Sequence, residues 1–232
     1  SGDITNLNLI QHIAKKKLPI LLSTGASNIS EIRKAEEQTG LDSNETTLLM
    51  ADCYFLAKDY ENASSAYQNL LLPEFSLEIR SKALFQYVQS LIELGNLAQA
   101  ASTLDNKDIE YNKLSSWWRA EWNLIAALKE KHGASKAFER VQGTLQSNND
   151  ALPEEIRIRL MWLQAQLGLD LEEKLKSTPE LAEKIMTMLE KSSSLDKGQF
   201  DMIRAQTILT KGQGLLRMKK ADESILAFEK LR

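Results

Sequence analysis

The chain has few of the residues that most often build chemical sites. Its 232 residues include one cysteine, Cys53, and two histidines, His12 and His132. One cysteine cannot form an internal disulfide, so the cysteine content leaves the cellular compartment open. A single thiol and two histidines that are distant in sequence also argue against a zinc site. We therefore expect neither a metal nor any other cofactor.

The chain also lacks an excess of basic residues and a long hydrophobic run. Lysine and arginine number 29, against 32 for aspartate and glutamate, which gives a net charge of -3. Nucleic-acid-binding proteins carry a surplus of basic residues, so we expect no nucleic-acid partner. No apolar run approaches the roughly 20 residues that cross a bilayer, so we expect no membrane span. The chain starts at Ser1 and its last residues continue a helical pattern, which predicts that it is a piece of a longer protein.

A regular spacing of small and large residues recurs in three segments after residue 42. A small or compact residue is followed 3 positions later by a large one, 12 later by a small one and 16 later by a large one. The three sets are Ala51, Tyr54, Ala63 and Tyr67; Val88, Leu91, Ala100 and Leu104; and Gly212, Leu215, Ser224 and Phe228. Small residues that face each other let two helices approach closely, so the spacing predicts antiparallel helical hairpins with large side chains between them.

The links and the intervening segments support a chain of hairpins. The stretches "AKDYEN" and "ELGNLAQ" are short, and Gly95 suits the left-handed conformation that follows many helix ends. The further pairs of helices that we expect are 113–130 with 133–146, 154–168 with 178–192, and 200–218 with 221–232. Within the second pair, Ser177 stands three residues before Glu180, which predicts a capping box.

The hairpin segments resemble tetratricopeptide repeats, whose period is about 34 residues. Residues 44–75 carry the Ala-x-x-Tyr, Asp-Tyr and Ala-x-x-x-Tyr elements of that family, with Pro73 near the end. Residues 76–108 keep Leu-Gly-Asn and paired alanines, and their anchor Val88 follows Ala51 by 37 residues. The resemblance implies an all-α, right-handed α-solenoid over residues 42–232 that acts as a non-catalytic protein-interaction module.

In tetratricopeptide arrays the first helix of each hairpin lines a concave groove. By register, the resemblance gives this role to Glu45, Leu48, Asp52 and Phe55; to Lys82, Phe85, Gln89 and Ile92; and to Gln206, Leu209, Gln213 and Leu216. Leu48 and Asp52 stand where chaperone-binding members place the Lys and Asn that hold a peptide carboxylate, which argues against that mode. A mixed apolar and amide groove favours an extended or helical peptide of a partner protein. The open C-terminal repeat adds self-association as an expectation.

The first 36 residues resemble a different family. The stretches "SGDITNLNLI", "LPILLSTG" and "SEI", with a helical segment between the first two, are similar to consecutive βα units of the sialic acid (N-acetylneuraminate) synthase barrel. That family condenses phosphoenolpyruvate with an N-acylated sugar. The resemblance implies that Ser1 and Ser23 lie at strand ends and contact phosphoenolpyruvate. Ala26 departs from the family, which usually has Met after the Ser-Thr-Gly.

The match is too short to close a barrel, which needs about 250 residues. We therefore divide the chain into an N-terminal segment, 1–41, which forms a helix-strand-helix lead-in, and a helical repeat domain, 42–232. Two interpretations of the first segment stay open. It is a relic or junction of a larger synthase-like enzyme with an attached helical-repeat domain, or a coincidental lead-in that caps the first repeat.

The remaining candidates favour structural roles. Trp117, Trp118 and Trp122 are the densest aromatic cluster, and Trp118 and Trp122 share a helix face. The cluster is either a patch for a partner or packing between hairpins, and packing is the favoured interpretation, more so for Trp162. Cys53 lies in a repeat helix with no histidine near it in sequence, so we expect a buried, inert thiol.

Overall fold

The computed structural model describes residue 34 and residues 43–105, 115–147, 152–192 and 195–231. Every regular element within these ranges is an α-helix, which confirms the predicted all-α class for this part of the chain. The predicted helix-strand-helix lead-in, with Ser1 and Ser23, lies outside the described residues. Among the described helices, none is both long and apolar enough to cross a membrane.

The chain divides into two compact units, Ser1–Ala100 and Ala101–Arg232. The division falls inside α6 (Leu97–Leu104), so the first unit contains the start of this helix and the second unit its end. The boundary that we expect between residues 41 and 42 stays a prediction, as does the arrangement of the hairpins as a solenoid.

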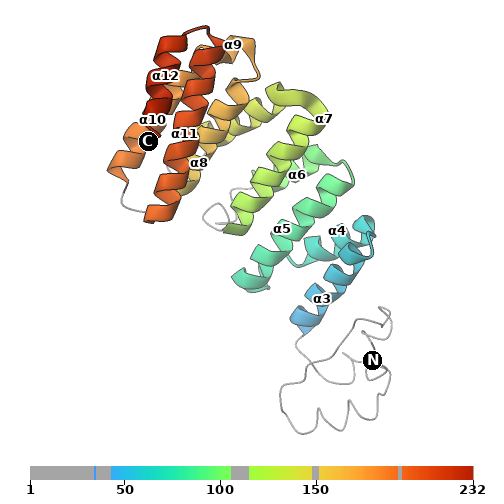
Figure 1. Cartoon of the computed structure of the whole chain (residues 1–232). Helices are drawn as coiled ribbons and strands as arrows, with labels where there is room; N and C mark the ends of the chain where they lie inside the picture. Colours follow the sequence, from blue (N-terminus) through green and yellow to red (C-terminus); the bar gives the residue numbers. More distant parts are fainter. Residues whose placement is uncertain (1–33, 35–42, 106–114, 148–151, 193–194, 232) are drawn as a thin grey trace. The chain divides into compact units, whose positions relative to one another are not determined.

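The first unit begins its described part with a helical hairpin, α3 (Ser43–Leu56) and α4 (Tyr60–Asn69), and α5 (Leu77–Glu93) packs against α4 (Figure 1). Ala51 and Ala63 are fully buried, as expected for small residues between two closely packed helices. Tyr67 and Leu70, near the end of α4, are also fully buried. The predicted sequence of small and large residues therefore builds the core of this hairpin.

Two side chains cap the helices of the first unit. Asp59 accepts a hydrogen bond from the Asn62 backbone N–H at the start of α4, at 3.3 Å. Ser76 accepts one from the Ile79 N–H at the start of α5, also at 3.3 Å. The first backbone N–H groups of a helix have no partner within the helix, so these oxygens stabilise both N-termini.

The same turn closes three hairpins. A residue with positive φ stands seven positions after Ala51, Val88 and Gly212: Lys58 (φ 60°), Gly95 (φ 78°) and Lys219 (φ 62°). At each turn this residue and the next donate backbone hydrogen bonds back to the helix end, for example Gly95 N–H to Ile92 O at 3.0 Å and Asn96 N–H to Leu91 O at 2.8 Å. This is the Schellman pattern of a helix C-terminus. Three hairpins thus share one turn at one position of the repeat.

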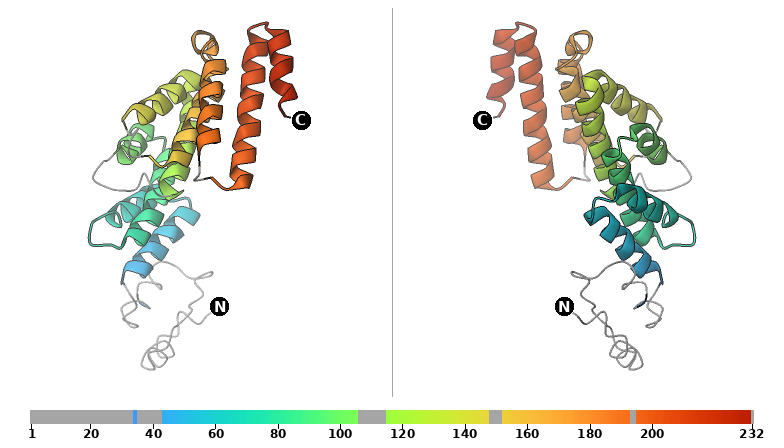
Figure 2. Two further views of the ribbon diagram at one scale, coloured as in Figure 1. Left: turned by 90° about the vertical axis from the view of Figure 1, so that its left-hand side faces the viewer. Right: turned by 90° about the vertical axis from the view of Figure 1, so that its right-hand side faces the viewer.

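The described residues of the second unit form six helices after the end of α6. They are α7 (Ser115–Ser147), α8 (Glu154–Gly168), α10 (Thr178–Lys191), α11 (Lys197–Arg217) and α12 (Ala221–Glu229), together with the one-turn α9 (Glu172–Leu175). Gly133 (φ 84°, ψ 172°) interrupts α7, so it consists of two helices, as the sequence predicts. Helices α10, α11 and α12 lie side by side (Figure 2), and α8 contacts α7, α10 and α11.

The core of this unit lies between α8, α10 and α11. Buried residues from the three helices pack together: Ile158, Met161, Ala165, Ile185, Leu189 and Ile203. On α8 and α10 these side chains recur every three or four residues, which is the spacing of one helix face. The apolar faces of the three helices thus hold this part of the unit together.

Helices α11 and α12 pack closely at Gly212. A Cβ atom on Gly212 would lie 2.2 Å from Cε1 of Phe228, so only glycine leaves room for that ring. Beside it, the Ser224 hydroxyl donates to the Gly212 carbonyl at 2.9 Å. The small residues predicted here allow a direct contact between a side chain and the neighbouring backbone.

The predicted capping box at Ser177 is wrong. Ser177 has helical backbone angles, and its hydroxyl donates to the Lys174 carbonyl at 2.8 Å instead of accepting from α10. The cause is α9, whose last turn runs into Ser177 and leaves no extended residue at that position. A capping box forms at Asp196 and Gln199, which start α11 three residues earlier than expected.

Candidate functional site

The predicted groove residues of the first unit lie on α3 and α5. On α3, Leu48, Asp52 and Phe55 are half-buried, and Phe55 packs edge-on against Tyr60 with ring centroids 5.4 Å apart. Glu45 belongs to α3, but its side chain lies outside the described residues. These side chains thus line one helix and are partly open to contact.

Asp52 makes a contact that sequence reasoning did not foresee. Its carboxylate accepts a hydrogen bond from the Tyr67 hydroxyl of α4 at 2.5 Å. Burial, and then the hydrogen bond and negative charge of Asp52, raise the pKa of Tyr67 above its usual range. Burial, followed by the charge of Asp52, also raises the pKa of the half-buried Cys53 thiol, which favours an unreactive thiol. One carboxylate oxygen of Asp52 therefore links α3 to α4 through the hydroxyl of Tyr67.

On α5 the predicted groove residues differ in exposure. Lys82 is exposed and pairs with Glu78 at 2.8 Å, whereas Phe85, Gln89 and Ile92 are half-buried. The side-chain nitrogen of Gln89 is buried and has no hydrogen-bond partner among the described residues. A buried amide donor without an acceptor costs free energy, so Gln89 needs a partner that the described side chains do not supply.

The last predicted set lies on α11, in the second unit. Leu209 and Leu216 are 42% and 58% exposed, Gln213 is exposed and Gln206 is half-buried. Met202 continues the same row and is 45% exposed. The structure therefore gathers these residues into one exposed, largely apolar row on a single helix. One groove shared by α3, α5 and α11 stays a prediction.

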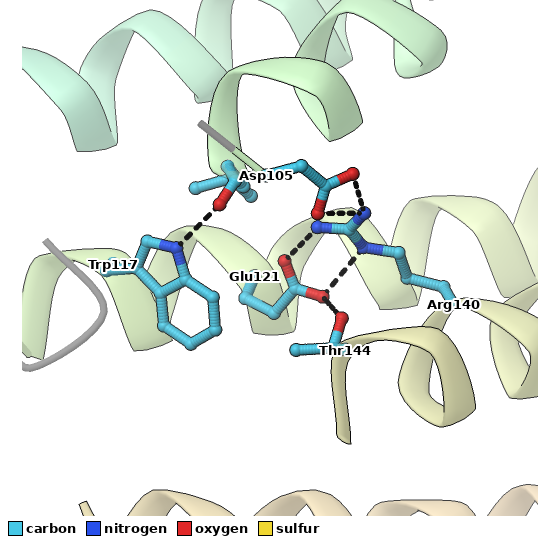
Figure 3. Close-up of polar contacts among 6 residues, drawn as sticks. Asp105, Trp117, Glu121, Arg140 and Thr144 are labelled. Carbon is cyan, nitrogen blue, oxygen red and sulfur yellow. Dashed lines mark hydrogen bonds and ion pairs between the residues drawn. The ribbon is translucent and has the colours of Figure 1, made fainter. Parts of the chain in front are cut away.

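A buried ion pair in the second unit is the feature that sequence reasoning missed (Figure 3). Glu121 has no exposed surface, and its carboxylate accepts from Nε and Nη2 of Arg140 at 2.8 and 2.7 Å. The Thr144 hydroxyl donates to Glu121 Oε1 at 3.1 Å. Nη1 of Arg140 reaches both oxygens of Asp105 at 2.8 and 2.9 Å. The network joins the end of α6 to both halves of α7.

The chemistry of this cluster is that of a structural network. Burial works against the charge of Arg140, but the charge and hydrogen bonds of Glu121 and then of Asp105 raise its pKa well above the usual range. Each guanidinium nitrogen donates to a carboxylate, so little capacity is left for a ligand. Bidentate contacts of this kind fix geometry as well as charge. Nearby, the Trp117 indole N–H donates to the Leu104 carbonyl at 3.1 Å and fixes α7 to α6.

A signal for the cluster is present in the sequence. Glu121 stands four residues after Trp117 and three before Leu124, so it shares the buried face of its helix. Arg140 stands three residues after Ala137 and four before Thr144, both of which are buried. An acidic and a basic residue on two buried faces of consecutive helices indicate a buried pair.

The tryptophans divide into two groups. Trp117 is buried, which confirms the packing interpretation for that residue. Trp118 packs edge-on against Trp122 at 5.5 Å, and Trp122 stacks on Trp162 of α8 at 6.1 Å with an interplanar angle of 3°. Trp162 also packs on the core of the unit, as expected, while Trp122 is 37% exposed. The contacts among these three rings join α7 to α8, and the Trp122 ring remains partly exposed.

No group of three or more His, Cys, Asp or Glu side chains that could hold a metal occurs among the described residues. Several carboxylates form ion pairs with cations of their own unit, as Asp170 does with Lys129 at 2.9 Å and with Arg217 at 3.3 Å. The described helices thus present exposed surfaces and buried ion-pair networks.

Two comparisons with known proteins bear on the N-terminal part. The model of the NeuB family matches residues 1–63. An N,N'-diacetyllegionaminic acid synthase of Legionella pneumophila (strain Philadelphia 1) is 51% identical over 35 residues, which is 15% of this chain. The chain spans about a tenth of that relative, since the match covers 10% of its length. Both findings support the resemblance of the first residues to a sialic acid synthase fragment.

The family match also reaches into the described helices. It includes all of α3 and the start of α4, and Ser1 and Ser23 lie within the same range. The similarity to the synthases therefore extends beyond residue 36, into the first hairpin of the helical part.

Proposed function

We propose that the helical part of this chain is a tetratricopeptide-like module that binds a peptide or a partner protein without catalysis. The observation that supports this best is the shared turn of three hairpins at Lys58, Gly95 and Lys219. A repeated hairpin with one register is the unit from which α-solenoids are built, and solenoids present extended concave surfaces. On this proposal the hairpins stack as a right-handed solenoid.

The packing of the hairpins supports the same proposal. Fully buried Ala51 and Ala63 lie twelve residues apart, as do fully buried Val88 and Ala100, and buried Gly212 and Ser224 occupy the corresponding positions of the last hairpin. This is the small-residue register that the repeat requires. The polar groups that look most like a site, at Glu121 and Arg140, satisfy one another. They favour a scaffold over an enzyme.

The proposed binding surface is the first helix of each hairpin. Its members are Glu45, Leu48, Asp52, Phe55, Lys82, Phe85, Gln89, Ile92, Gln206, Leu209, Gln213 and Leu216. Half-buried aromatic and aliphatic side chains give apolar contact area, and the unpaired amide of Gln89 offers a donor to a carbonyl of the ligand. This combination suits a peptide that is bound through both its side chains and its backbone.

A capture experiment tests the surface. Proteins retained by the wild-type chain are compared with those retained by Phe55→Asp, Phe85→Asp and Gln89→Ala. We expect the surface variants to lose the retained partner, because truncation of a central apolar contact commonly costs 2 kcal/mol or more of binding, roughly 30-fold. Leu56→Asp is the matched control, since Leu56 lies on α3 and is 81% exposed but outside the surface.

Circular dichroism and the thermal midpoint establish that each variant is folded. If folded surface variants retain every partner as well as wild type does, the groove is not the binding surface.

A second candidate function rests on the comparisons alone. We propose as the alternative that the chain is part of a synthase-like enzyme that condenses phosphoenolpyruvate with an acylated sugar, with Ser1 and Ser23 as its phosphate contacts. The support is the family match over residues 1–63 and the relative whose name is that of an acid-sugar synthase.

Thermal unfolding with phosphoenolpyruvate and a divalent metal tests the alternative. A ligand that binds only the folded form raises the midpoint. A rise that Ser23→Ala abolishes supports the alternative, and an unchanged midpoint at millimolar ligand counts against it.

A further inference from the structure

Helix α11 carries an exposed apolar row that its own unit does not cover. Met202, Leu209 and Leu216 are 45%, 42% and 58% exposed. They are seven residues apart, which is almost two helical turns, so they lie on one face at intervals of roughly 10.5 Å. The opposite face of α11 is buried and includes Thr207, Ile208 and Leu215. The helix is thus apolar on an outer face as well as on its inner one.

The row carries no charge along its length. The residues that lie beside it on the same face are Gln206 and Gln213, again seven apart. The nearest exposed charges lie at its two ends, with Asp196, Lys197 and Asp201 at the first end and Arg217, Lys219 and Lys220 at the second. The row is therefore neutral in the middle, with a net acidic charge at one end and basic residues at the other.

We propose that this row is a self-association surface, on which α11 of a second copy of the chain packs in antiparallel orientation about a two-fold axis at Leu209. The inference rests on the proposed function, because Gln206, Leu209, Gln213 and Leu216 belong to the proposed binding surface, and it names the partner of that part of the surface.

The symmetry of the row favours a second copy. A two-fold axis pairs positions that are equally far from Leu209 on either side. Leu209 then faces Leu209, Met202 faces Leu216, and Gln206 lies near Gln213, so apolar groups meet apolar groups and amides meet amides. Contact between two identical faces brings like charges together wherever the face is charged, and the centre of this row has none.

The charges at the ends favour the antiparallel orientation. In that orientation Asp201 lies level with the basic end of the second copy, where Lys219 is exposed and Arg217 already contacts Asp170 of its own unit. A parallel pair would place acid beside acid and base beside base. Antiparallel pairing also opposes the two helix dipoles.

The spacing of the row matches a helix and not a strand. Successive exposed residues are roughly 10.5 Å apart, the distance between positions i and i+7 of a helix. In a strand this distance spans about three residues, and an odd number of residues turns the side chains to opposite faces. The row is short, so we expect a dimer of the weak class, with an interface at the low end of about 1,200 Å² or less.

Sedimentation velocity of the full chain tests the proposal, at protein concentrations from about 1 μM to about 200 μM. We expect the wild-type sedimentation coefficient to rise with concentration toward that of a dimer. Leu209→Glu places two like charges on the axis, and we expect it to raise the dissociation constant at least tenfold. The control is Leu226→Glu, at a residue on α12 that is 62% exposed, which should leave self-association unchanged.

Disulfide cross-linking tests the axis itself. In a Cys53→Ser background, Leu209→Cys should link to a second copy on oxidation, because the axis passes through that residue. Met202→Cys and Leu216→Cys should link poorly alone and efficiently when mixed. Equal linking of Met202→Cys to itself would indicate a parallel pair and overturn the proposal.

The outcomes separate this inference from the proposed function. A chain that is monomeric at every concentration overturns self-association, while loss of captured partners in the Phe85→Asp variant still supports the groove. If the chain is monomeric and the Leu209→Glu variant no longer captures a protein that the wild type captures, the row binds a helix of another protein. The second-copy proposal is then wrong. If the dimer forms but the groove variants change nothing, the self-association stands and the groove proposal fails.

Discussion

Glu121 shows how much a single charge depends on its surroundings. It has no exposed surface, and its stability in the fold depends on the bidentate contact with Arg140 and the hydroxyl of Thr144. A buried pair stabilises less than its Coulomb energy suggests, because both ions lose their hydration. Loss of one member, however, leaves the other buried without compensation.

We expect Glu121→Gln to lower the free energy of unfolding by about 3 kcal/mol, because it leaves the Arg140 guanidinium buried and short of one negative charge. The measurement is urea unfolding followed by circular dichroism. The double variant Glu121→Leu with Arg140→Met should be more stable than the single variant, since it removes both charges. Glu139→Gln, which breaks the exposed pair with Lys136, is the control and should change stability little. Equal stability of Glu121→Gln and wild type would contradict the structural role.

Two glycines that lie within helices make opposite predictions. We expect Gly212→Ala to destabilise the chain by about 1–3 kcal/mol, because its Cβ would collide with the Phe228 ring. Gly143→Ala has no atom within 4 Å of its Cβ and should stabilise the chain by up to about 1 kcal/mol through helix propensity. Thermal unfolding of both variants checks the difference. The same sign for both would mean that the contact between α11 and α12 is looser than described.

At the scale of elements, the hairpin turn is the repeated feature. Its central position has positive φ in all three hairpins, yet only Gly95 is a glycine, and Lys58 and Lys219 occupy the same conformation. Left-handed conformation costs an L-residue roughly 1–2 kcal/mol, so the tertiary contacts of these hairpins hold the lysines there. The turn is therefore set by helix packing as much as by the residue.

We expect Lys58→Gly and Lys219→Gly each to stabilise the chain by up to about 1 kcal/mol, because glycine adopts positive φ without a steric cost. Gly95→Ala should have the opposite effect. The measurement is the midpoint of chemical unfolding, with Lys184→Gly in the middle of α10 as a control that should destabilise by about 1 kcal/mol. If glycine at position 58 or 219 destabilises the chain, the shared turn is not what closes these hairpins.

At the scale of the whole molecule, the chain consists of two compact units, and the similarity to the synthases covers the start of the first. Contacts between helices that are distant in sequence hold the second unit together. Asp170, which follows α8, pairs with Lys129 of α7 and with Arg217 of α11. One carboxylate thereby links three parts of the unit.

The acid stability of the chain should depend on this carboxylate. The hydrogen bond from Lys129 lowers the pKa of Asp170, and the contact with Arg217 adds to the effect, although partial burial opposes it. A carboxyl group whose pKa is lower in the folded state stabilises the fold above its unfolded pKa of about 4, and this contribution is lost as the pH falls through the folded pKa.

We therefore expect the wild type to lose more stability than Asp170→Asn as the pH falls from about 5 to about 2. Unfolding midpoints over this range measure the difference, and parallel curves for the two proteins would show that the ion pairs do not stabilise the fold. Asp222→Asn, at an exposed residue of α12, is the control and should follow the wild type.

The sequence by itself determined the helices, their order and most of their ends. Apolar residues at every third or fourth position favour amphipathic helices. Small residues twelve positions apart in three segments locate the hairpins. Gly133 was identified as the break in α7 for the same local reason. These features depend on residues that are close together in the chain, so the sequence alone is enough to predict them.

Only the tertiary structure decided which polar groups meet. Glu121 and Arg140 are nineteen positions apart, and their pairing depends on how the two halves of α7 fold against each other. Ser177 failed as a cap because α9 precedes it, and Asp52 bonds to Tyr67 of the next helix. The sequence placed Gln206, Leu209, Gln213 and Leu216 on one face of α11, but their exposure was decided by α8, α10 and α12, which pack against the same helix. Hydrogen bonds and exposure are set by residues distant in sequence, and a local pattern does not contain them.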